Sequence, residues 1–150
     1  MTQPHNDFVR GIDAGLTFWQ NKAKRMDEDS INDLNVMRKN LILILEFGLQ
    51  WPQTWQKAAQ LFVHLFRFFQ LRNHWVEGQS LLRMARQHAP DKETALYMQL
   101  LQQTGHLHRL QRNLKRALAI HTDAAVQLRQ MQDDRLLAKL LVELTFDNLS

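Results

Sequence analysis

Apolar residues recur every three or four positions along nearly the whole chain, and this spacing predicts helices that each bury one face. No stretch alternates apolar and polar residues with the enrichment in β-branched side chains that is typical of a strand. The first helix is expected at about 7–25, with an apolar stripe formed by Phe8, Ile12, Leu16 and Trp19. The pattern therefore predicts an all-α fold.

Short breaks between the periodic segments divide the chain into about seven helices. A second helix is expected from Ser30 to about Gln50, because Ser30 and Asp33 have the spacing of a capping motif. Pro52 suits the first turn of a third helix, since a missing N–H costs nothing there. Asn73 suits the tight exit before a fourth helix. The last three helices are expected at about 92–109, 113–132 and 135–150.

Two helical hairpins repeat along the sequence at a constant offset. This offset is the number of positions from Trp75 to Leu114, and we call it the hairpin period. The fourth helix carries the stripe Trp75, Gly78, Leu82, Ala85 and Ala89, and the sixth carries Leu114, Ala117, His121, Ala124 and Leu128. The third carries Phe62, Leu65, Phe66 and Phe69, and the fifth carries Leu101, Thr104, Gly105 and His108. A further step, longer by one position, leads from the fifth helix to Leu141, Leu144, Thr145 and Asn148. The seventh helix is therefore interpreted as half of a third repeat.

These offsets predict a single helical-repeat domain over residues 1–150. Its parts are a degenerate helix pair at 1–52, repeats at 53–92 and 93–134, and the first helix of an incomplete repeat at 135–150. Small residues at 78 and 117 are expected to let the partner helix of the hairpin come close, while large side chains fill the remaining space. Pro90 cannot continue a helix, so it sets the turn into the next repeat.

This alternation of small and large positions resembles the tetratricopeptide repeat, and residues 59–92 match it best. The structural positions of the repeat are assigned to Phe62, Leu65, Phe69, Trp75, Gly78, Leu82, Ala85, Pro90, Leu101, Gly105, Ala117 and Ala124. Phe66 and His121 depart from the family pattern. The hairpin period is also longer than the standard repeat of about 34 residues. The resemblance implies an α-solenoid, that is, a right-handed superhelix of antiparallel helical hairpins.

A narrower resemblance covers residues 33–90. Asn40-Leu41 lies inside an apolar helix, and an aromatic-rich helix and the sequence Trp75-x-Glu77-Gly78 follow it. This order is similar to the start of the helical sensor arm of bacterial signalling NTPases of the apoptotic-regulator type. The chain has no G-x-x-x-x-G-K-[ST] phosphate-binding loop. An NTPase engine would therefore lie in another chain or in another part of a longer protein.

In the tetratricopeptide family, the inner, concave faces of the first helices line a peptide-binding groove. The corresponding positions here are Gln60, Val63, Arg67, Gln70, Gln99, Gln102, His106, Arg109 and Lys139. None of them is acidic, and Gln, Arg and Lys side chains donate hydrogen bonds to carbonyls and carboxylates. The resemblance implies a protein or peptide partner, and the charge of the groove favours an acidic one. The alternative interpretation is an ordinary solvated helix face.

No group of residues in the sequence predicts catalysis, a cofactor or a metal site. The chain has no cysteine, and the side chains of His106 and His108 point about 200° apart on a helix. His108 and His121 are instead expected to serve as packing residues. Gly78-Gln79-Ser80 lacks the second glycine of a nucleophile elbow. Asp133-Asp134 is expected to form a turn that caps the seventh helix. We therefore expect a protein that is not an enzyme.

Two functions are compatible with these features. The first is a noncatalytic scaffold for protein interaction. The alternative is a nucleic-acid-binding repeat with a basic concave face, since 19 Lys and Arg residues against 15 acids give a net charge of +4. An apolar stripe on the seventh helix also predicts a homo-oligomer, or else a chain that is a fragment of a longer protein. That stripe is Leu136, Leu137, Leu140, Leu141 and Leu144.

The sequence predicts a cytoplasmic protein. The start of the chain lacks the charged region and apolar run of a secretory signal. The longest apolar run, residues 41–49, is interrupted by Glu46 and is shorter than the roughly 20 residues that a bilayer requires. The absence of cysteine is compatible with a reducing compartment.

Overall fold

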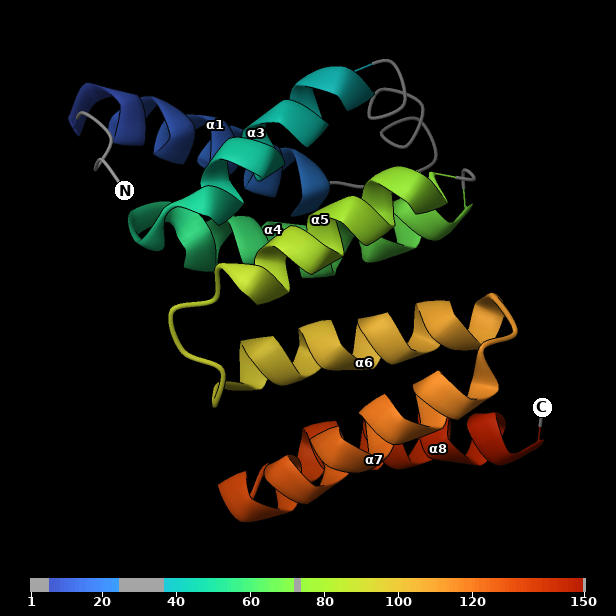
Figure 1. Cartoon of the computed structure of the whole chain (residues 1–150). Coiled ribbons are helices and arrows are strands. Elements are labelled where there is room, and N and C mark those ends of the chain that lie inside the picture. Colours follow the sequence, from blue (N-terminus) through green and yellow to red (C-terminus); the bar gives the residue numbers. More distant parts are fainter. Residues whose placement is uncertain (1–5, 25–36, 72–73, 150) are drawn as a thin grey trace. The chain divides into compact units, whose positions relative to one another are not determined.

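A computed structural model describes residues 6–24, 37–71 and 74–149, and in these ranges the chain forms α-helices and no strand (Figure 1). The helices are α1 (Asn6–Lys24), α3 (Arg38–Gln50), α4 (Pro52–Leu71), α5 (Trp75–Gln87), α6 (Ala95–Leu110), α7 (Leu114–Met131) and α8 (Asp134–Leu149). The predicted all-α class with about seven helices is confirmed. The capping motif expected at Ser30 lies outside the described residues.

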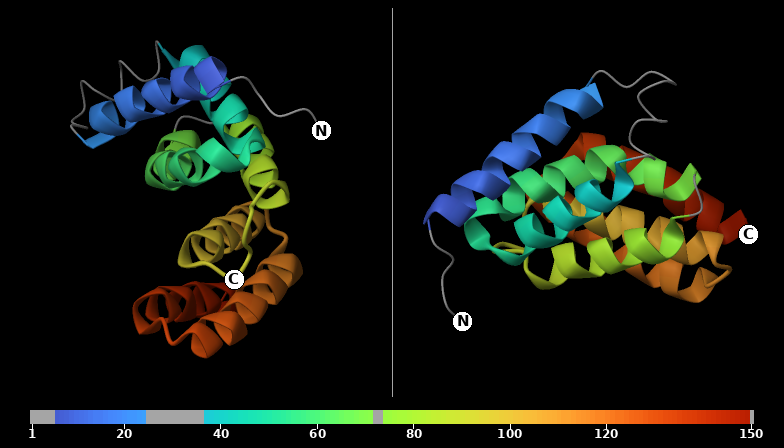
Figure 2. Two further views of the ribbon diagram at one scale, coloured as in Figure 1. Left: turned by 90° about the vertical axis from the view of Figure 1, so that its left-hand side faces the viewer. Right: turned by 90° about the horizontal axis from the view of Figure 1, so that it is seen from above.

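The chain divides into two compact units. Unit 1, Met1–Pro90, contains α1, α3, α4 and α5, and unit 2, Asp91–Ser150, contains α6, α7 and α8. In unit 1, α4 packs against α1, α3 and α5. In unit 2, the three helices all contact one another, and α7 and α8 lie side by side (Figure 2). Unit 1 is therefore built around α4, and unit 2 is built around α7, which packs closely against both α6 and α8.

Local capping chemistry sets where several helices begin. Pro52 opens α4, as the sequence predicts. Thr94 caps α6, because its side-chain oxygen accepts a hydrogen bond from the backbone N–H of Tyr97 at 3.2 Å. This cap places the start of α6 slightly later than the expected position 92. The Asp133 carboxylate accepts from the Leu136 N–H at 3.1 Å, which confirms the predicted cap of α8.

The hairpin period is visible in the helix bounds. Ala95 begins α6 and Asp134 begins α8, and these two residues are one hairpin period apart. Leu110 and Leu149, which end the two helices, are separated by the same number of positions. The turn after α6 is closed by a hydrogen bond from the Asn113 N–H to the His108 carbonyl at 2.8 Å. The bond from His74 to Phe69, at 3.1 Å, occupies the same place one period earlier. The left-handed residue of the later turn is Arg112, with φ of 64°.

The step into α8 therefore equals the hairpin period, and the expected longer step is wrong. With the longer step, Leu101 corresponds to Leu141, whose side chain is 42% exposed. With the hairpin period, it corresponds to Leu140, which is 1% exposed. The hairpin period also carries His108 to Asp147, which is buried. Helix bounds and burial thus agree on one period for both steps.

Close approach between helices depends on paired small and large residues. Gly78 of α5 lies against Phe69 of α4, where an added Cβ would lie 3.1 Å from the Phe69 Cβ. Trp55 of α4 reaches the other end of α5, and its indole N–H donates to the Ala85 carbonyl at 2.9 Å. Ala85 is fully buried. Contacts at both ends therefore hold α5 on α4.

In unit 2 the small residue lies on the first helix and the large one on the second. His121 of α7 is fully buried against Gly105 of α6, and an added Cβ at Gly105 would overlap the imidazole ring. In unit 1 the equivalent positions, one period earlier, hold Phe66 and Leu82, which are both buried. The two departures from the family pattern, Phe66 and His121, are therefore alternative ways of filling the same interhelical space.

We expect Gly105→Ala to destabilise the protein by about 1–3 kcal/mol, because the methyl group would overlap the His121 ring in a packed core. Gly11→Ala is the matched control. Gly11 also lies inside a helix, but an added Cβ there meets nothing within 4 Å. That substitution should stabilise the protein by about 0.5–1 kcal/mol through helix propensity. Urea unfolding would measure both values, and equal effects would contradict the assigned packing.

Candidate functional site

The outer face of α4 carries the four groove positions assigned to unit 1. Gln60 and Arg67 are exposed, and Val63 and Gln70 are partly buried. On the opposite side of α4, Phe62, Leu65 and Phe69 are each at most 1% exposed. The helix therefore separates a packed face from an open polar face, as the repeat pattern predicts for a first helix.

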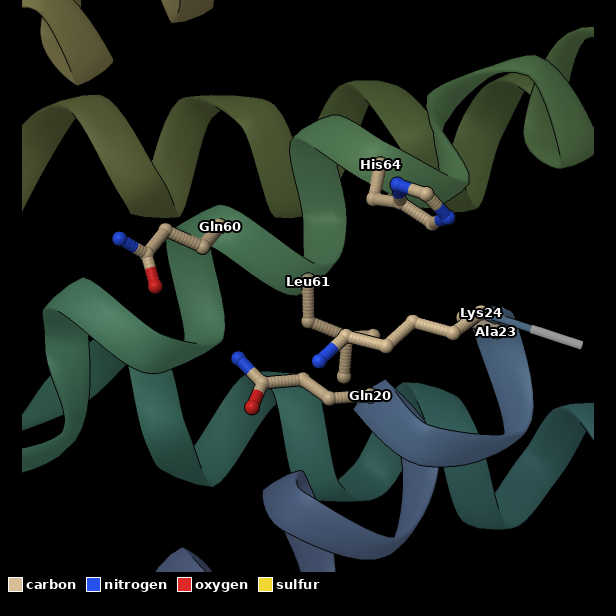
Figure 3. A pocket seen from close by; sticks show the side chains of 6 residues that line it. All are labelled: Gln20, Ala23, Lys24, Gln60, Leu61 and His64. Carbon is tan, nitrogen blue, oxygen red and sulfur yellow. The ribbon is translucent and has the colours of Figure 1, made fainter.

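A hollow of about 310 Å³ lies between α1 and this open face. It is lined by Gln20, Ala23, Lys24, Gln60, Leu61 and His64 (Figure 3). Leu61 and Ala23 are buried beneath it and supply its apolar part. The Gln20 side-chain amide also donates to the Lys57 carbonyl at 3.4 Å, which ties α1 to α4 at the hollow. Sequence analysis identified only Gln60 of this group.

The groove positions of unit 2 have different surroundings. Gln99, Gln102, His106 and Arg109 are partly buried on α6, and Lys139 is exposed on α8. With the hairpin period, Gln99 corresponds to Ala138 instead of Lys139. The assignment of Lys139 depended on the longer step, so its register is corrected here.

Arg109 is paired within unit 2. Its guanidinium contacts the Glu143 carboxylate of α8 at 2.6 Å and the backbone carbonyl of Glu143 at 3.3 Å. It also lies 3.6 Å from the Asp147 carboxylate and 5.3 Å from the centre of the Phe146 ring. These contacts leave the Arg109 side chain only 13% exposed. Arg109 thus holds α6 to α8, and its charge is already balanced by acids of the same unit.

His106 contacts both Arg109 and Glu143. Its Nδ1 atom lies 2.7 Å from an Arg109 guanidinium nitrogen and 3.3 Å from a Glu143 carboxylate oxygen. A guanidinium only donates hydrogen bonds, so Nδ1 accepts from Arg109 in the tautomer whose proton is on Nε2. With a proton on Nδ1, the same atom donates to the Glu143 carboxylate instead. His106 therefore contacts both members of the Arg109–Glu143 ion pair.

A second pair lies deeper in the same cluster. His121 and Asp147 have fully buried side chains, with the His121 Nδ1 atom 2.5 Å from the Asp147 carboxylate. The His121 Nε2 atom lies 3.1 Å from the carbonyl of Gln102. Since a carbonyl only accepts, Nε2 carries a proton and donates. His121 therefore connects all three helices of unit 2: it lies on α7 and bonds α6 through Nε2 and α8 through Nδ1.

We call these residues the ion cluster: His106, Arg109, His121, Glu143 and Asp147. Their contacts join the three helices of unit 2. Burial raises the pKa of Glu143, but the hydrogen bond from His106 and the positive charges of His106, Arg109 and His121 outweigh burial. The pKa of Glu143 consequently lies below its usual 4.5. Sequence analysis assigned His106 and Arg109 to the groove without their acidic partners. The signal was available, since Glu143 and Asp147 have the i, i+4 spacing that places them on one face of α8.

The outer face of α8 is apolar. The large side chains Leu141, Val142, Phe146 and Leu149 are 42%, 54%, 51% and 78% exposed. Leu136, Leu140 and Asp147 lie on the opposite side and are buried. The predicted exposed stripe is wrong for Leu136 and Leu140, because α8 uses these two residues to pack within unit 2. The exposed apolar face is instead shifted around the helix.

Within residues 6–24, 37–71 and 74–149, no three His, Cys, Asp or Glu side chains are grouped so as to hold a metal ion. No helix in these ranges is both long and apolar enough to cross a membrane.

No protein-family model, curated protein or solved structure matches the chain.

We expect Glu143→Gln to lower the free energy of unfolding at pH 7 by about 1–3 kcal/mol, because Arg109 would lose its closest carboxylate. The pKa of Glu143 is lowered by folding, so its ionisation stabilises the protein fully above about pH 4.5. This contribution is lost as the pH falls through the lower pKa of the folded state. The difference between wild type and Glu143→Gln should therefore shrink below pH 4.5.

Urea unfolding between pH 3 and pH 7 would test this pH dependence. Glu93→Gln serves as the control, since Glu93 is exposed in the segment before α6. A gap between wild type and Glu143→Gln that stays constant over this pH range would show that Arg109 and Glu143 do not form the assigned ion pair in solution.

Proposed function

We propose that this protein is a noncatalytic helical-repeat module, of tetratricopeptide-like design, that binds an acidic protein or peptide segment. The observation that carries the proposal is the composition of the open face of α1 and α4. Lys24, Gln60, His64 and Arg67 are exposed there, and none of the hollow's lining residues is acidic. Cationic and amide groups in such a row donate hydrogen bonds to carboxylates and to backbone carbonyls.

The same face favours a peptide over a nucleic acid. Single-stranded nucleic acids are bound by basic grooves with aromatic side chains on which the bases stack. The hollow has no aromatic residue apart from the His64 imidazole, and the aromatic rings of Phe62, Phe66 and Phe69 are buried. The resemblance to the sensor arm of a signalling NTPase supports placing such a module in bacterial signalling. A cytoplasmic location stays a prediction from the sequence.

We expect Arg67→Glu to weaken binding of an acidic probe by about 10-fold to 100-fold, because it replaces a charge-assisted hydrogen bond with repulsion. The probe is a fluorescein-labelled decapeptide that alternates Glu and Leu, measured by fluorescence anisotropy. Arg83→Glu is the matched control, with the same change at an exposed position on α5. Circular dichroism should be unchanged in both variants.

Two outcomes would overturn this assignment. Equal loss of binding in Arg67→Glu and Arg83→Glu would show that only net charge matters. The second outcome is tighter binding of a labelled oligouridine than of the peptide, with an affinity that falls steeply as the salt concentration rises. This result would show that the face binds nucleic acid.

For the outer face of α8, we propose that the partner is a second copy of this chain. Ala138, Leu141, Val142, Thr145 and Leu149 form an uncharged stripe, and an uncharged stripe can meet its own copy across a two-fold axis without repulsion. Ala138 and Thr145 are small and have heptad spacing, which lets a second helix come close. Large side chains flank these two positions.

The polar side chains on this face each make a hydrogen bond within α8. The Thr145 hydroxyl donates to the Leu141 carbonyl at 3.0 Å, and the Asn148 amide donates to the Leu144 carbonyl at 2.9 Å. The Thr145 donor and one N–H of Asn148 therefore stay satisfied when the stripe is covered, which reduces the cost of polar desolvation. The homo-oligomer predicted through the C-terminal helix is kept, with the contact surface moved to Leu141, Val142 and Leu149.

We expect Val142→Asp to convert a dimer into a monomer, because the dimer would bury two carboxylates against apolar side chains. Val126→Asp on α7 is the matched control, since Val126 is 50% exposed against 54% for Val142. Sedimentation equilibrium over a range of protein concentrations would measure the association constant. A wild-type protein that is monomeric at all concentrations, or a dimer that both variants retain, would contradict the proposed pairing.

A further inference from the structure

The hollow between α1 and α4 brings together hydrogen-bond donors from two helices. Gln20 and Lys24 come from α1, and Gln60 and His64 come from α4. In Figure 3 the Lys24 side chain extends over Leu61, and its ammonium group points toward the Gln20 amide. The Gln60 amide and the His64 ring lie on the α4 side of the same space. Polar side chains from both helices therefore line the hollow.

The charge of this hollow is not balanced by the described residues around it. Among these residues, no carboxylate lies within ion-pairing distance of Lys24. Asp13 of α1 is paired instead with Lys57, at 2.8 Å. Lys24 therefore adds one positive charge to the donors of two glutamine amides and an imidazole ring. A single cation favours a monoanion over a phosphate dianion, and a lining without carboxylates disfavours a metal ion.

The apolar side of the hollow restricts the ligand further. Leu61 and Ala23 form an apolar floor of which little is exposed, at 1% and 3%. A volume of about 310 Å³ is at the lower end of the range for small-molecule sites. A ligand that enters the hollow can place a negatively charged end at Lys24 and a short apolar chain along the methylene groups of the Lys24, Gln20 and Gln60 side chains.

We propose that this hollow binds a free, small monocarboxylate with a short branched apolar chain. Lys24 donates to the carboxylate together with the Gln60 amide and the protonated nitrogen of His64. The Gln20 amide, tied to the Lys57 carbonyl, positions the Lys24 ammonium from the α1 side. This small-molecule site goes beyond the proposed binding of a protein partner and does not depend on it.

The test uses the full chain and two probes of the same shape, isovalerate and its neutral amide, isovaleramide. Ring carbon and proton shifts of His64 report on the hollow by NMR, at constant pH in a buffer without carboxylates. We expect saturable shifts with isovalerate and none with isovaleramide. Lys24→Met should reduce the affinity for isovalerate at least about 10-fold. Lys39→Met, which removes an exposed lysine of α3, should leave it unchanged.

A second variant guards against misfolding of Lys24→Met. Gln60→Leu removes one donor and should also weaken binding of isovalerate, while Gln56→Leu, at an exposed position on the same helix, should not. Arg67→Glu, which tests the protein-binding proposal, should keep the response to isovalerate. Loss of peptide binding with retained isovalerate binding therefore separates the two functions.

Several results would overturn the proposal. One is an equal response to isovaleramide, which would reduce the site to apolar contact, and another is no response to either probe. Stronger binding of inorganic phosphate would show that the ligand class is wrong. Binding of the peptide acetyl-Gly-Gly-Val with a free carboxyl group, without binding of isovalerate, would show that the hollow binds the C-terminus of a peptide instead of a free acid.

Discussion

The packing of a first helix against its second helix is the constraint on which the rest of this structure depends. A helix of the repeat can come close to its partner only where one side of the contact is small and the other fills the space. Gly78 meets Phe69 in unit 1, and Gly105 meets His121 in unit 2. The two units place the small residue on opposite members of the hairpin. Each close contact therefore needs one small and one large residue, and either helix of the hairpin can supply the small one.

The choice of a histidine to fill that volume has electrostatic consequences. A fully buried imidazole needs hydrogen-bond partners at both nitrogens, because an unsatisfied polar group in a core costs about 1–3 kcal/mol. The Gln102 carbonyl satisfies one nitrogen and Asp147 the other. Asp147 then introduces a buried negative charge, which lies 3.6 Å from Arg109. A packing residue of α7 thus explains why charged residues are present inside unit 2.

The ion cluster also limits where a partner can bind. Arg109 and His106 lie at positions that the sequence pattern assigns to a groove, but their polar atoms already contact Glu143 and each other. A ligand carboxylate at Arg109 would have to displace Glu143, which lies at 2.6 Å. Lys24 and Arg67 have no comparable acid among the described residues near them. Binding of a ligand carboxylate therefore costs less free energy at the cations of unit 1 than at Arg109 of unit 2.

Helical periodicity was enough to predict the fold class, the positions of most helix ends and the residues of both packed hairpins. These features depend on patterns within a single hairpin period, which the sequence displays directly. The step into α8 was misjudged by one position because leucines occur on both sides of that helix, so Leu140 and Leu141 fit the pattern equally well. Only burial distinguishes them, at 1% and 42% exposure.

The ion cluster and the hollow could not be predicted in the same way. Both depend on how side chains from separate helices meet, such as His121 with Asp147 and Gln20 with the backbone of Lys57. Spacing along one helix shows which residues share a face, but it does not show which face of another helix lies opposite. That information comes from packing across the unit.

Outward positions of the repeat change from polar and cationic on α4 to uncharged on α8. Gln60, His64 and Arg67 of α4 correspond, two periods later, to Ala138, Val142 and Thr145 of α8. The first set is polar and cationic, and the second is uncharged and mostly apolar. Outward positions contact only solvent or a partner, so their polarity can change without disturbing the packed core. The same hairpin period can therefore present a polar, cationic face on α4 and an apolar face on α8.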